Sequence, residues 1–270
     1  MLHQGLGRIK AYPHFVREML HLYHTFRAAS RSPGAERIND VYVGKWRFGD
    51  FENPARIIRG LTERGGEAPF RRPRQRPDIY FPFLTAKPFW DRDDIAAVLE
   101  RSVDVIRAEF RAVDALADAH REGLTDAGFW TTYEFFRGKR RRESNCARCP
   151  ETTRVIAQSP NCGEWAGAAF FSILEPGTHI KPHCGTTNGR LRYHLTIEAA
   201  DGASIRVDDR VGSWTLDQCL ILDDSFVHEV THQGTERRVV LVVDMWHPEL
   251  TDLERRVLAA SFLLPPDEEH

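Results

Sequence analysis

The segment FSILEPGTHIKPHCGTTNGRLRYHLTIE, residues 171–198, contains apolar stretches separated by the turn-forming pairs Pro176-Gly177 and Asn188-Gly189. Its apolar stretches are rich in β-branched, aromatic and aliphatic residues, which favour β-strands. Runs of this kind recur at close intervals through the second half of the chain: AAFFSILE (168–175), RLRYHLTIE (190–198), ASIRV (203–207), QCLILDD (218–224), HEVTH (228–232) and RRVVLVVDMW (237–246). Such short runs separated by turns predict an antiparallel sandwich or jelly roll of roughly a hundred residues.

Helical periodicity marks the flanks of this β region. Residues 14–29 carry apolar side chains at spacings of three and four, which predicts an amphipathic helix, whereas residues 33–88 are rich in Gly, Pro and Arg and predict loops. After Pro248, Thr251 with Glu254 forms a capping box for a last helix. We therefore expect a mainly β fold with a helical N-terminal portion and a double-stranded β-helix core flanked by helices.

One more helix is predicted immediately before the β region. Asp91 or Asp94 can cap it, and Gly123 can end it. Its apolar stripe consists of Ile95, Val98, Leu99, Ile106, Phe110, Val113 and Leu116. We place an N-terminal helix and loop region at residues 1–90 and the functional domain at residues 91–270, together forming one continuous globular unit.

Composition narrows the class of protein. The chain has 270 residues, 41% of them hydrophobic, and a net charge of -2, so nothing in the overall charge indicates a nucleic-acid partner. No apolar run is long enough to span a bilayer, and the first residues lack the apolar core of a secretory signal. We expect a cytoplasmic protein without stable membrane association.

The five cysteines are expected to be reduced thiols in such a setting. Cys146 and Cys149 form an isolated CxxC motif. A structural zinc site would need two further ligands, and only Cys162 lies nearby in the sequence, so we do not expect one. The Arg-rich segments at residues 71–76 and 139–142 are read as solvated loops, with an anion-facing rim as the alternative.

Charged and imidazole side chains share one face of the run at residues 190–198. Because side chains alternate along a strand, Arg190, Arg192 and His194 fall on one face, opposite an apolar face. Buried cations need anionic partners, which a small dianion would supply. The alternative to a bound dianion is that Arg192 and Arg238 form ion pairs with Asp223, Asp224 or Asp244.

Two further histidines stand at strand ends, and an arginine begins the last core strand. His183 precedes one run, His228 follows the acidic pair after another, and Arg238 starts VVLVV. Taken alone, each histidine is more often structural than metal-binding. Neutral imidazoles can bind iron, zinc, nickel or copper, so the residues together indicate a metal-binding β-sandwich without specifying a reaction.

At these residues the chain resembles the aspartyl/asparaginyl β-hydroxylase family of Fe(II)/2-oxoglutarate-dependent dioxygenases. The resemblance is carried by residues 171–198 and by ILDDSFVHEVTHQGTERRVVLVVDMWHPEL at residues 221–250. Upstream, YFPFLTAKPFWD at residues 80–91 looks like a further family segment. Two long blocks in the right order are more specific than a short motif. The strong similarity covers about residues 165–250.

The resemblance implies a distorted double-stranded β-helix and a set of site residues. His183 and His228 would bind Fe(II), while Gly185 stands where most such oxygenases have a carboxylate ligand; the family also has glycine there and uses water instead. The co-substrate 2-oxoglutarate would meet Arg238 at its distal carboxylate, supported by Ser172. The resemblance also implies that Arg192 and His194 lie near the end of 2-oxoglutarate that chelates iron, and that Arg190 lies near the carboxylate of the substrate.

The implied reaction converts 2-oxoglutarate and O2 to succinate and CO2 while hydroxylating the β-carbon of an aspartyl or asparaginyl side chain. The substrate would be a peptide, a carrier-bound amino acid or a free amino acid. Alternatives are hydroxylation of a lipid acyl chain or of free proline, a non-catalytic jelly-roll protein that binds metal and 2-oxoglutarate, and a zinc hydrolase.

Overall fold

The computed structural model describes residues 56–57, 60, 73–119, 123–158, 161, 165–198 and 201–260. They belong to two compact units, and the larger one comprises the described residues within Pro69–Asp78 and Thr85–His247. The helix expected at residues 14–29 lies outside the described residues, and the division of the chain at residue 90 stays a prediction.

The smaller unit includes helix α8 (Asp252–Ala260). Its expected capping box is confirmed: the Thr251 N–H donates to the Glu254 carboxylate at 2.9 Å, and the Glu254 N–H donates to the Thr251 hydroxyl at 3.2 Å. The two carboxylate oxygens of Glu254 also accept from one edge of the buried Arg56 guanidinium, Oε1 from Nε at 2.5 Å and Oε2 from Nη2 at 2.6 Å. The capping carboxylate therefore also anchors a segment almost two hundred residues away.

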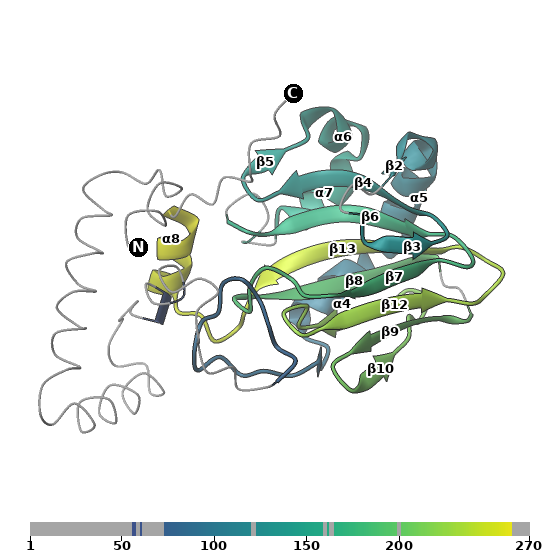
Figure 1. Cartoon of the computed structure of the whole chain (residues 1–270). Coiled ribbons are helices and arrows are strands. Elements are labelled where there is room, and N and C mark those ends of the chain that lie inside the picture. Colours follow the sequence, from purple (N-terminus) through teal and green to yellow (C-terminus); the bar gives the residue numbers. More distant parts are fainter. Residues whose placement is uncertain are drawn as a thin grey trace, which may run out of the picture. The chain divides into compact units, whose positions relative to one another are not determined.

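Two antiparallel sheets form the larger unit (Figure 1). Within the described residues, the eight-stranded sheet has the order β1 (Phe89–Trp90), β11 (Cys219–Leu222), β8 (Arg190–Glu198), β13 (Arg238–Trp246), β6 (Ala168–Leu174), β4 (Trp130–Arg137) and β2 (Asp118–Ala119), with β5 (Arg140–Arg141) paired to β4. The five-stranded sheet has the order β10 (Arg210–Gly212), β9 (Ala203–Val207), β12 (His228–His232), β7 (His179–His183) and β3 (Thr125–Ala127). The expected mainly β, jelly-roll fold is confirmed.

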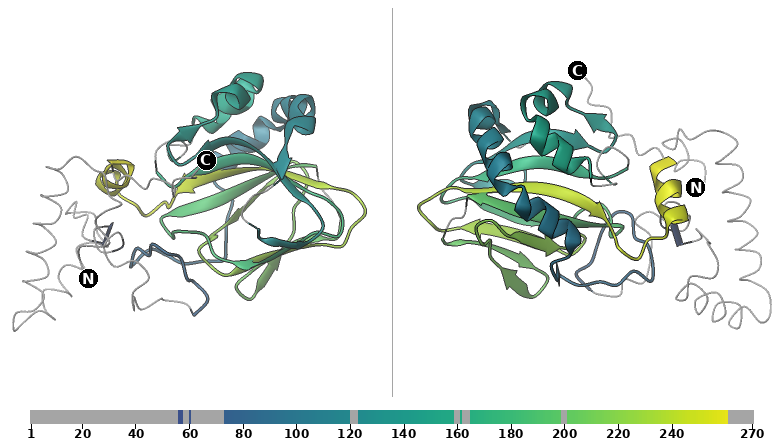
Figure 2. Two further views of the ribbon diagram at one scale, coloured as in Figure 1. Left: turned by 45° about the horizontal axis from the view of Figure 1, so that its top comes forward. Right: turned by 180° about the vertical axis from the view of Figure 1, so that it is seen from behind.

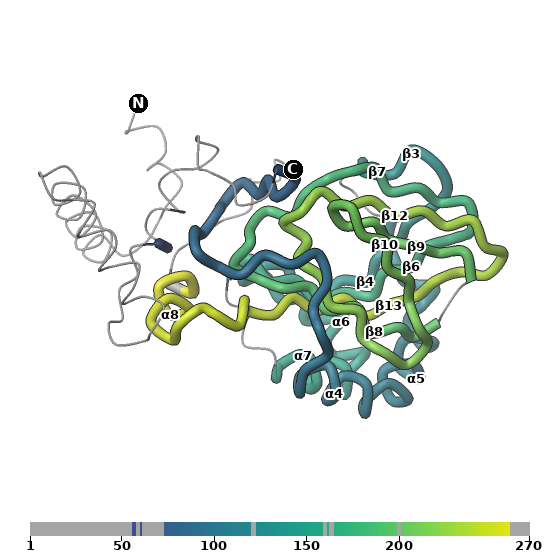
Figure 3. The backbone as a smooth tube through the Cα atoms, turned by 90° about the horizontal axis from the view of Figure 1, so that it is seen from below, coloured from purple at the N-terminus to yellow at the C-terminus, as the bar shows by residue number. Residues whose placement is uncertain are grey.

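Helices cover the outer face of the larger sheet. They are α4 (Asp94–Arg101), α5 (Val103–Val113), the short 3-10 helix η2 (Asp114–Leu116), α6 (Glu143–Arg148) and α7 (Pro150–Ile156). Figure 2, from behind, shows helices across that face, and Figure 3 shows the order of layers: smaller sheet, larger sheet, helices. None of the helices described is long and apolar enough to cross a bilayer.

Strand alternation gives the larger unit two apolar cores. On β8 the odd-numbered residues Leu191, Tyr193 and Leu195 belong to the core shared with the helices. On β6 the alternate residues Phe170 and Leu174 belong instead to the core between the sheets. The even-numbered residues of β8 therefore face the other sheet, which confirms that Arg190, Arg192 and His194 share the inner face.

The helix predicted before the β region is in fact two helices. Ser102 interrupts it, with φ -99° and ψ 3°, and its hydroxyl donates to the Val98 carbonyl at 3.0 Å. A serine hydroxyl that bonds the preceding turn offers the backbone an alternative to continued helix. The cap is Asp93, whose carboxylate accepts from the Ala96 N–H at 2.9 Å, rather than Asp91 or Asp94.

The ends of the predicted stripe also differ from expectation. Leu99, Ile106 and Phe110 are buried as expected, but Ile95 and Leu116 are 40% and 48% exposed. α5 stops at Val113, and the chain leaves η2 as a strand, well before Gly123. The apolar spacing alone did not reveal this termination.

Candidate active site

His183 and His228 meet across one pair of strands. His183 ends β7, His228 begins β12, and the two residues face each other in the antiparallel ladder. Their ring centroids lie 4.1 Å apart, with the ring planes inclined at 53°. The structure therefore brings together the two residues predicted to bind a metal.

Each of these imidazoles is oriented by the backbone carbonyl two residues before it in the chain. Nδ1 of His183 lies 2.8 Å from the Lys181 carbonyl, and Nδ1 of His228 lies 2.9 Å from the Phe226 carbonyl. A carbonyl only accepts, so a neutral imidazole donates from Nδ1 and carries its lone pair on Nε2, the form that binds metals. Burial and the neighbouring His183 lower the pKa of His228 to about 4, which keeps it neutral at physiological pH.

Gly185 has no room for a third protein ligand. A Cβ built there would lie 2.4 Å from the carboxylate of Asp224, and the Gly185 N–H donates to the Asp224 carbonyl at 2.6 Å. In the part of the chain that the structure describes, no group of three or more His, Cys, Asp or Glu side chains is placed to hold a metal. Two imidazoles with an open side fit a metal that must also bind small molecules.

Asp224 is fully buried beside this open side. Its Oδ2 accepts a hydrogen bond from Arg190 Nη2 at 2.9 Å and forms an ion pair with Arg192 Nη1 at 3.1 Å, but Oδ1 has no hydrogen-bond partner among the described residues. Burial alone would raise the pKa of Asp224, but Arg190 and Arg192 outweigh it and hold that pKa well below its usual range. The site therefore contains an ionised carboxylate with one oxygen available as an acceptor.

Asp244 completes a four-membered network of opposite charges. It accepts a hydrogen bond from Arg192 Nε at 2.8 Å and forms an ion pair with Arg190 Nη1 at 3.1 Å, and it is fully buried. Two guanidiniums and two carboxylates cancel, so the network is neutral overall. The pairing of Arg192 with Asp224 and Asp244, left open by the sequence, is confirmed; contact of Arg190 with a substrate carboxylate stays a prediction.

Arg238 is the exception among the buried arginines. It is 2% exposed at the start of β13, and its Nη1 lies 3.4 Å from the Ser172 hydroxyl. No carboxylate of the described residues pairs with it, and its Nε has no hydrogen-bond partner there. Burial lowers its pKa to about 9, so it is still protonated at neutral pH. An uncompensated buried cation is costly and indicates that an anion binds beside it.

His194 is held by a tryptophan. The Trp214 Nε1–H donates to Nδ1 of His194 at 3.1 Å, and the two ring planes are within 12° of parallel. Burial and the nearby Arg238 and Arg192 lower the pKa of His194 well below its usual range, so this imidazole is neutral.

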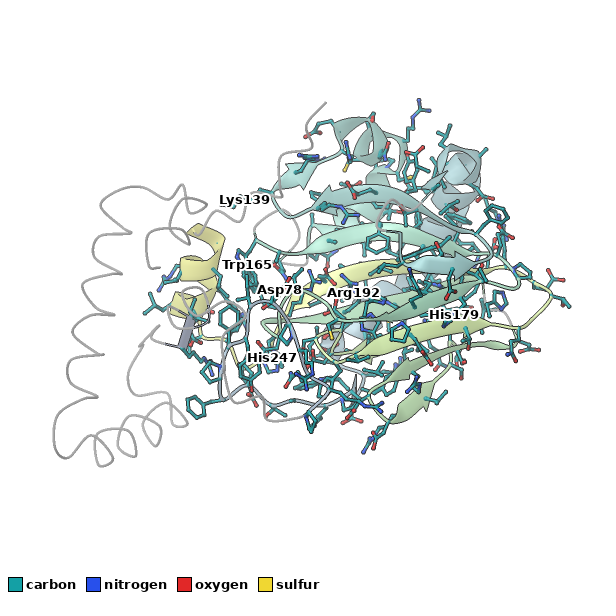
Figure 4. The ribbon with its side chains drawn as sticks, viewed as in Figure 1. Asp78, Lys139, Trp165, His179, Arg192 and His247 are labelled. Atoms are coloured by element: carbon teal, nitrogen blue, oxygen red, sulfur yellow. The ribbon has the colours of Figure 1, made fainter. Side chains whose placement is uncertain are left out.

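A cavity between the sheets is lined by both facing imidazoles, His194 and Arg238. Its volume is about 50 Å³, several times the roughly 10–15 Å³ that one water requires. Figure 4 labels Arg192, which lines this cavity, and His179, which lies farther along the sandwich and does not line it. The cavity is lined by Trp130, Phe170, Ser172, Ile180, His183, Arg192, His194, Ile205, Trp214, Leu222, His228, Val230, Arg238 and Val242.

Residues 100–248 match the sequence profile of the family described as Aspartyl/Asparaginyl beta-hydroxylase. The chain belongs to this family. Aspartate beta-hydroxylase domain-containing protein 2 of Rattus norvegicus is 33% identical over 227 residues, which cover 78% of this chain and 65% of that protein. Aspartyl/asparaginyl beta-hydroxylase of Homo sapiens is 36% identical over 188 residues, which cover 66% of this chain and 25% of that protein. The chain thus spans less than two thirds of the length of these relatives.

Two solved structures align with parts of the chain. A prolyl-4-hydroxylase of Pseudomonas putida aligns with a TM-score of 0.36 and 17% identity, covering 57% of this chain and 98% of that structure. A cupin-2 domain from Rhodospirillum rubrum aligns with a TM-score of 0.31 and 11% identity, covering 48% of this chain and 69% of that structure.

In this member of the aspartyl/asparaginyl β-hydroxylase family, one cavity gathers every predicted site residue except Arg190. Arg190 lies in the charge network instead, where its guanidinium also donates to the Ala166 carbonyl. Trp214 was not predicted from the sequence. It lies in the segment SWTLDQ, outside the stretches predicted as strands. In the sequence it looks like an ordinary core aromatic residue, and only its contacts with His194 and Arg238 distinguish it.

Proposed function

We propose that this chain is an Fe(II)- and 2-oxoglutarate-dependent dioxygenase that hydroxylates the β-carbon of an aspartyl or asparaginyl side chain, in a peptide, a carrier-bound amino acid or a free amino acid. One observation carries the proposal: a buried guanidinium without a carboxylate partner, Arg238, lines the same small cavity as two facing imidazoles. A metal at the imidazoles and a dianion reaching Arg238 would together satisfy both groups.

His183 and His228 would hold the metal through Nε2, since both Nδ1 atoms face backbone carbonyls. When bound, iron and 2-oxoglutarate would supply the oxidative chemistry, in which O2 and the keto acid give succinate, CO2 and a hydroxylated product. The unpartnered Oδ1 of Asp224, which lies next to Gly185, suits a water held by the metal in place of a third protein ligand. This acceptor would compensate in part for the missing carboxylate ligand.

The co-substrate would lie between the metal and Arg238. Arg238 and the Ser172 hydroxyl would bind its distal carboxylate through charge-assisted hydrogen bonds. Arg192 and His194 would lie nearer the chelating end, since both line the cavity beside His228. Apolar cavity walls such as Phe170 and Val242 would exclude water and strengthen these polar contacts.

Charge balance supports an acidic substrate. The network of Arg190, Arg192, Asp224 and Asp244 is neutral overall, His194 and His228 are neutral, and Arg238 adds one positive charge. A divalent metal and a dianionic keto acid cancel each other, so the loaded site would keep one positive charge. Opposite charge at short range favours binding of a carboxylate-bearing substrate.

The direct test is anaerobically reconstituted protein supplied with Fe(II), 2-oxoglutarate and then air. Succinate should form, and one of a panel of Asp-, Asn- and Pro-containing compounds should gain the mass of one oxygen. His183→Ala should abolish both signals, whereas Lys181→Ala, which keeps the backbone carbonyl that orients His183, should retain them.

Three other results would each contradict the proposal in a different way. Tight binding of 2-oxoglutarate without succinate from any compound would favour a non-catalytic binding protein. Hydroxylation of only an acyl chain or free proline would assign the enzyme to a different substrate class. Tightly held zinc and turnover without oxygen would favour a hydrolase.

A further inference from the structure

We propose that Trp214 is a positioning residue that fixes both His194 and Arg238, so that the two side chains present hydrogen-bond donors of defined direction to one dianion. The identity of that dianion as 2-oxoglutarate rests on the function proposed above, but the positioning itself does not. Trp214 is 7% exposed and packs in the core between the sheets.

The indole touches side chains from two neighbouring strands. It reaches His194 on β8 through the 3.1 Å hydrogen bond to Nδ1, and the Arg238 guanidinium on β13 lies 4.5 Å from its ring centroid. These strands pair antiparallel, with Val242 opposite His194 and a register shift between Val239 and Val240, next to Arg238. One rigid side chain therefore contacts two polar groups that stand on neighbouring strands.

The hydrogen bond determines which nitrogen of His194 carries the proton. An indole N–H only donates, so Nδ1 of His194 must accept and the proton of the neutral ring must sit on Nε2. His194 thus has the opposite tautomer to His183 and His228, whose Nδ1 atoms face carbonyl acceptors. Nε2 of His194 is therefore a hydrogen-bond donor, whereas Nε2 of His183 and of His228 carries a lone pair that can bind a metal.

The ring face has a separate effect on Arg238. A guanidinium over an indole is attracted by the ring quadrupole, and this attraction is strongest where water is excluded. Within the described residues Arg238 has no carboxylate partner, so the indole and the Ser172 hydroxyl are the groups that orient it. The guanidinium is therefore held ready before an anion arrives.

Trp214→Phe separates the two effects, because it keeps an aromatic face and removes the N–H donor. Nitrogen-15 NMR of the full chain labelled at histidine reads the tautomer of His194 directly. The wild-type ring should show the Nε2–H form, and the variant should show a mixture or the Nδ1–H form. In steady-state assays, the KM for 2-oxoglutarate should rise about five- to tenfold, as expected for one lost hydrogen bond, while kcat changes less.

Trp90→Phe is the matched control. The Trp90 indole N–H is buried and has no hydrogen-bond partner among the described residues, and Trp90 does not line the cavity. It should leave both the His194 signal and the KM unchanged. Trp214→Leu, which also loses the ring face, should raise the KM further than Trp214→Phe.

An Nδ1–H signal from wild-type His194 would overturn the inference, even if 2-oxoglutarate proves to be the co-substrate. An unchanged tautomer and KM in Trp214→Phe would do the same. If no 2-oxoglutarate binds, the function proposed above fails while the wild-type tautomer still decides the positioning role. That measurement also stands if Trp214→Phe does not fold.

Discussion

Replacing Arg238 by methionine should make the ligand-free protein more stable and remove its response to a dianion. Burial lowers the pKa of Arg238 from 12.5 to about 9. Since one pKa unit corresponds to about 1.4 kcal/mol, keeping this group charged inside the protein costs about 4–5 kcal/mol at neutral pH. Methionine has a similar volume and no charge, so Arg238→Met should recover a part of this, on the order of 1–4 kcal/mol.

Urea unfolding with and without 2-oxoglutarate, under anaerobic conditions with metal present, measures both effects. The wild-type protein should gain about 2.7 kcal/mol at a ligand concentration a hundred times its Kd, whereas Arg238→Met should gain almost nothing. A variant that is less stable than the wild type, or that still responds to the ligand, would refute an uncompensated guanidinium as the anion site.

Arg237→Met is the matched control for this experiment. Arg237 is the residue just before β13 and does not line the cavity, and it pairs with Glu198 and with Asp114, each at 2.7 Å. Its side chain is one third exposed, so loss of these pairs should cost roughly 0–1 kcal/mol. Stabilisation by 2-oxoglutarate should stay at the wild-type value.

Three further changes test other parts of the structure. Gly185→Asp should not tighten metal binding, measured by competition with a chelator, because the new side chain collides with Asp224; tighter binding would contradict the close approach. Burial raises the pKa of Asp223 to about 7, so its contribution to stability falls as pH rises from about 4 to 7. Asp223→Asn should remove this fall, and equal pH profiles in urea unfolding would argue against it. Thr251→Ala should destabilise α8 by about 1 kcal/mol through loss of its cap, read as faster amide exchange in that helix; unchanged exchange would argue against the capping box.

The sequence predicted features that depend on local periodicity. The alternation of residues 190–198 placed two arginines and a histidine on one face, and the structure confirms it because a strand leaves no other arrangement. The spacing of Thr251 and Glu254 likewise predicted the cap of α8. These patterns need no information from distant parts of the chain.

Features that depend on tertiary contacts could not be predicted from local sequence patterns. Asp223 and Asp224 are adjacent and looked equivalent as partners for the arginines, yet Asp224 is ionised in the charge network, whereas Asp223 accepts from Ser225 and Gln75 and has a raised pKa. The facing of His183 and His228 depends on the pairing of two strands 45 positions apart, and the sequence supplied that only through a family resemblance.

Both imidazoles occupy a single rung of the ladder between β7 and β12. A register shift interrupts that ladder immediately after this rung, between His228 and Val230, so the rung lies next to an irregularity rather than within continuous pairing. An ion bridging the two rings would act as a cross-strand staple at this weak point. Chelation should therefore loosen the smaller sheet first, with amide exchange accelerating along β7 and β12 while β8 and β13 keep their protection.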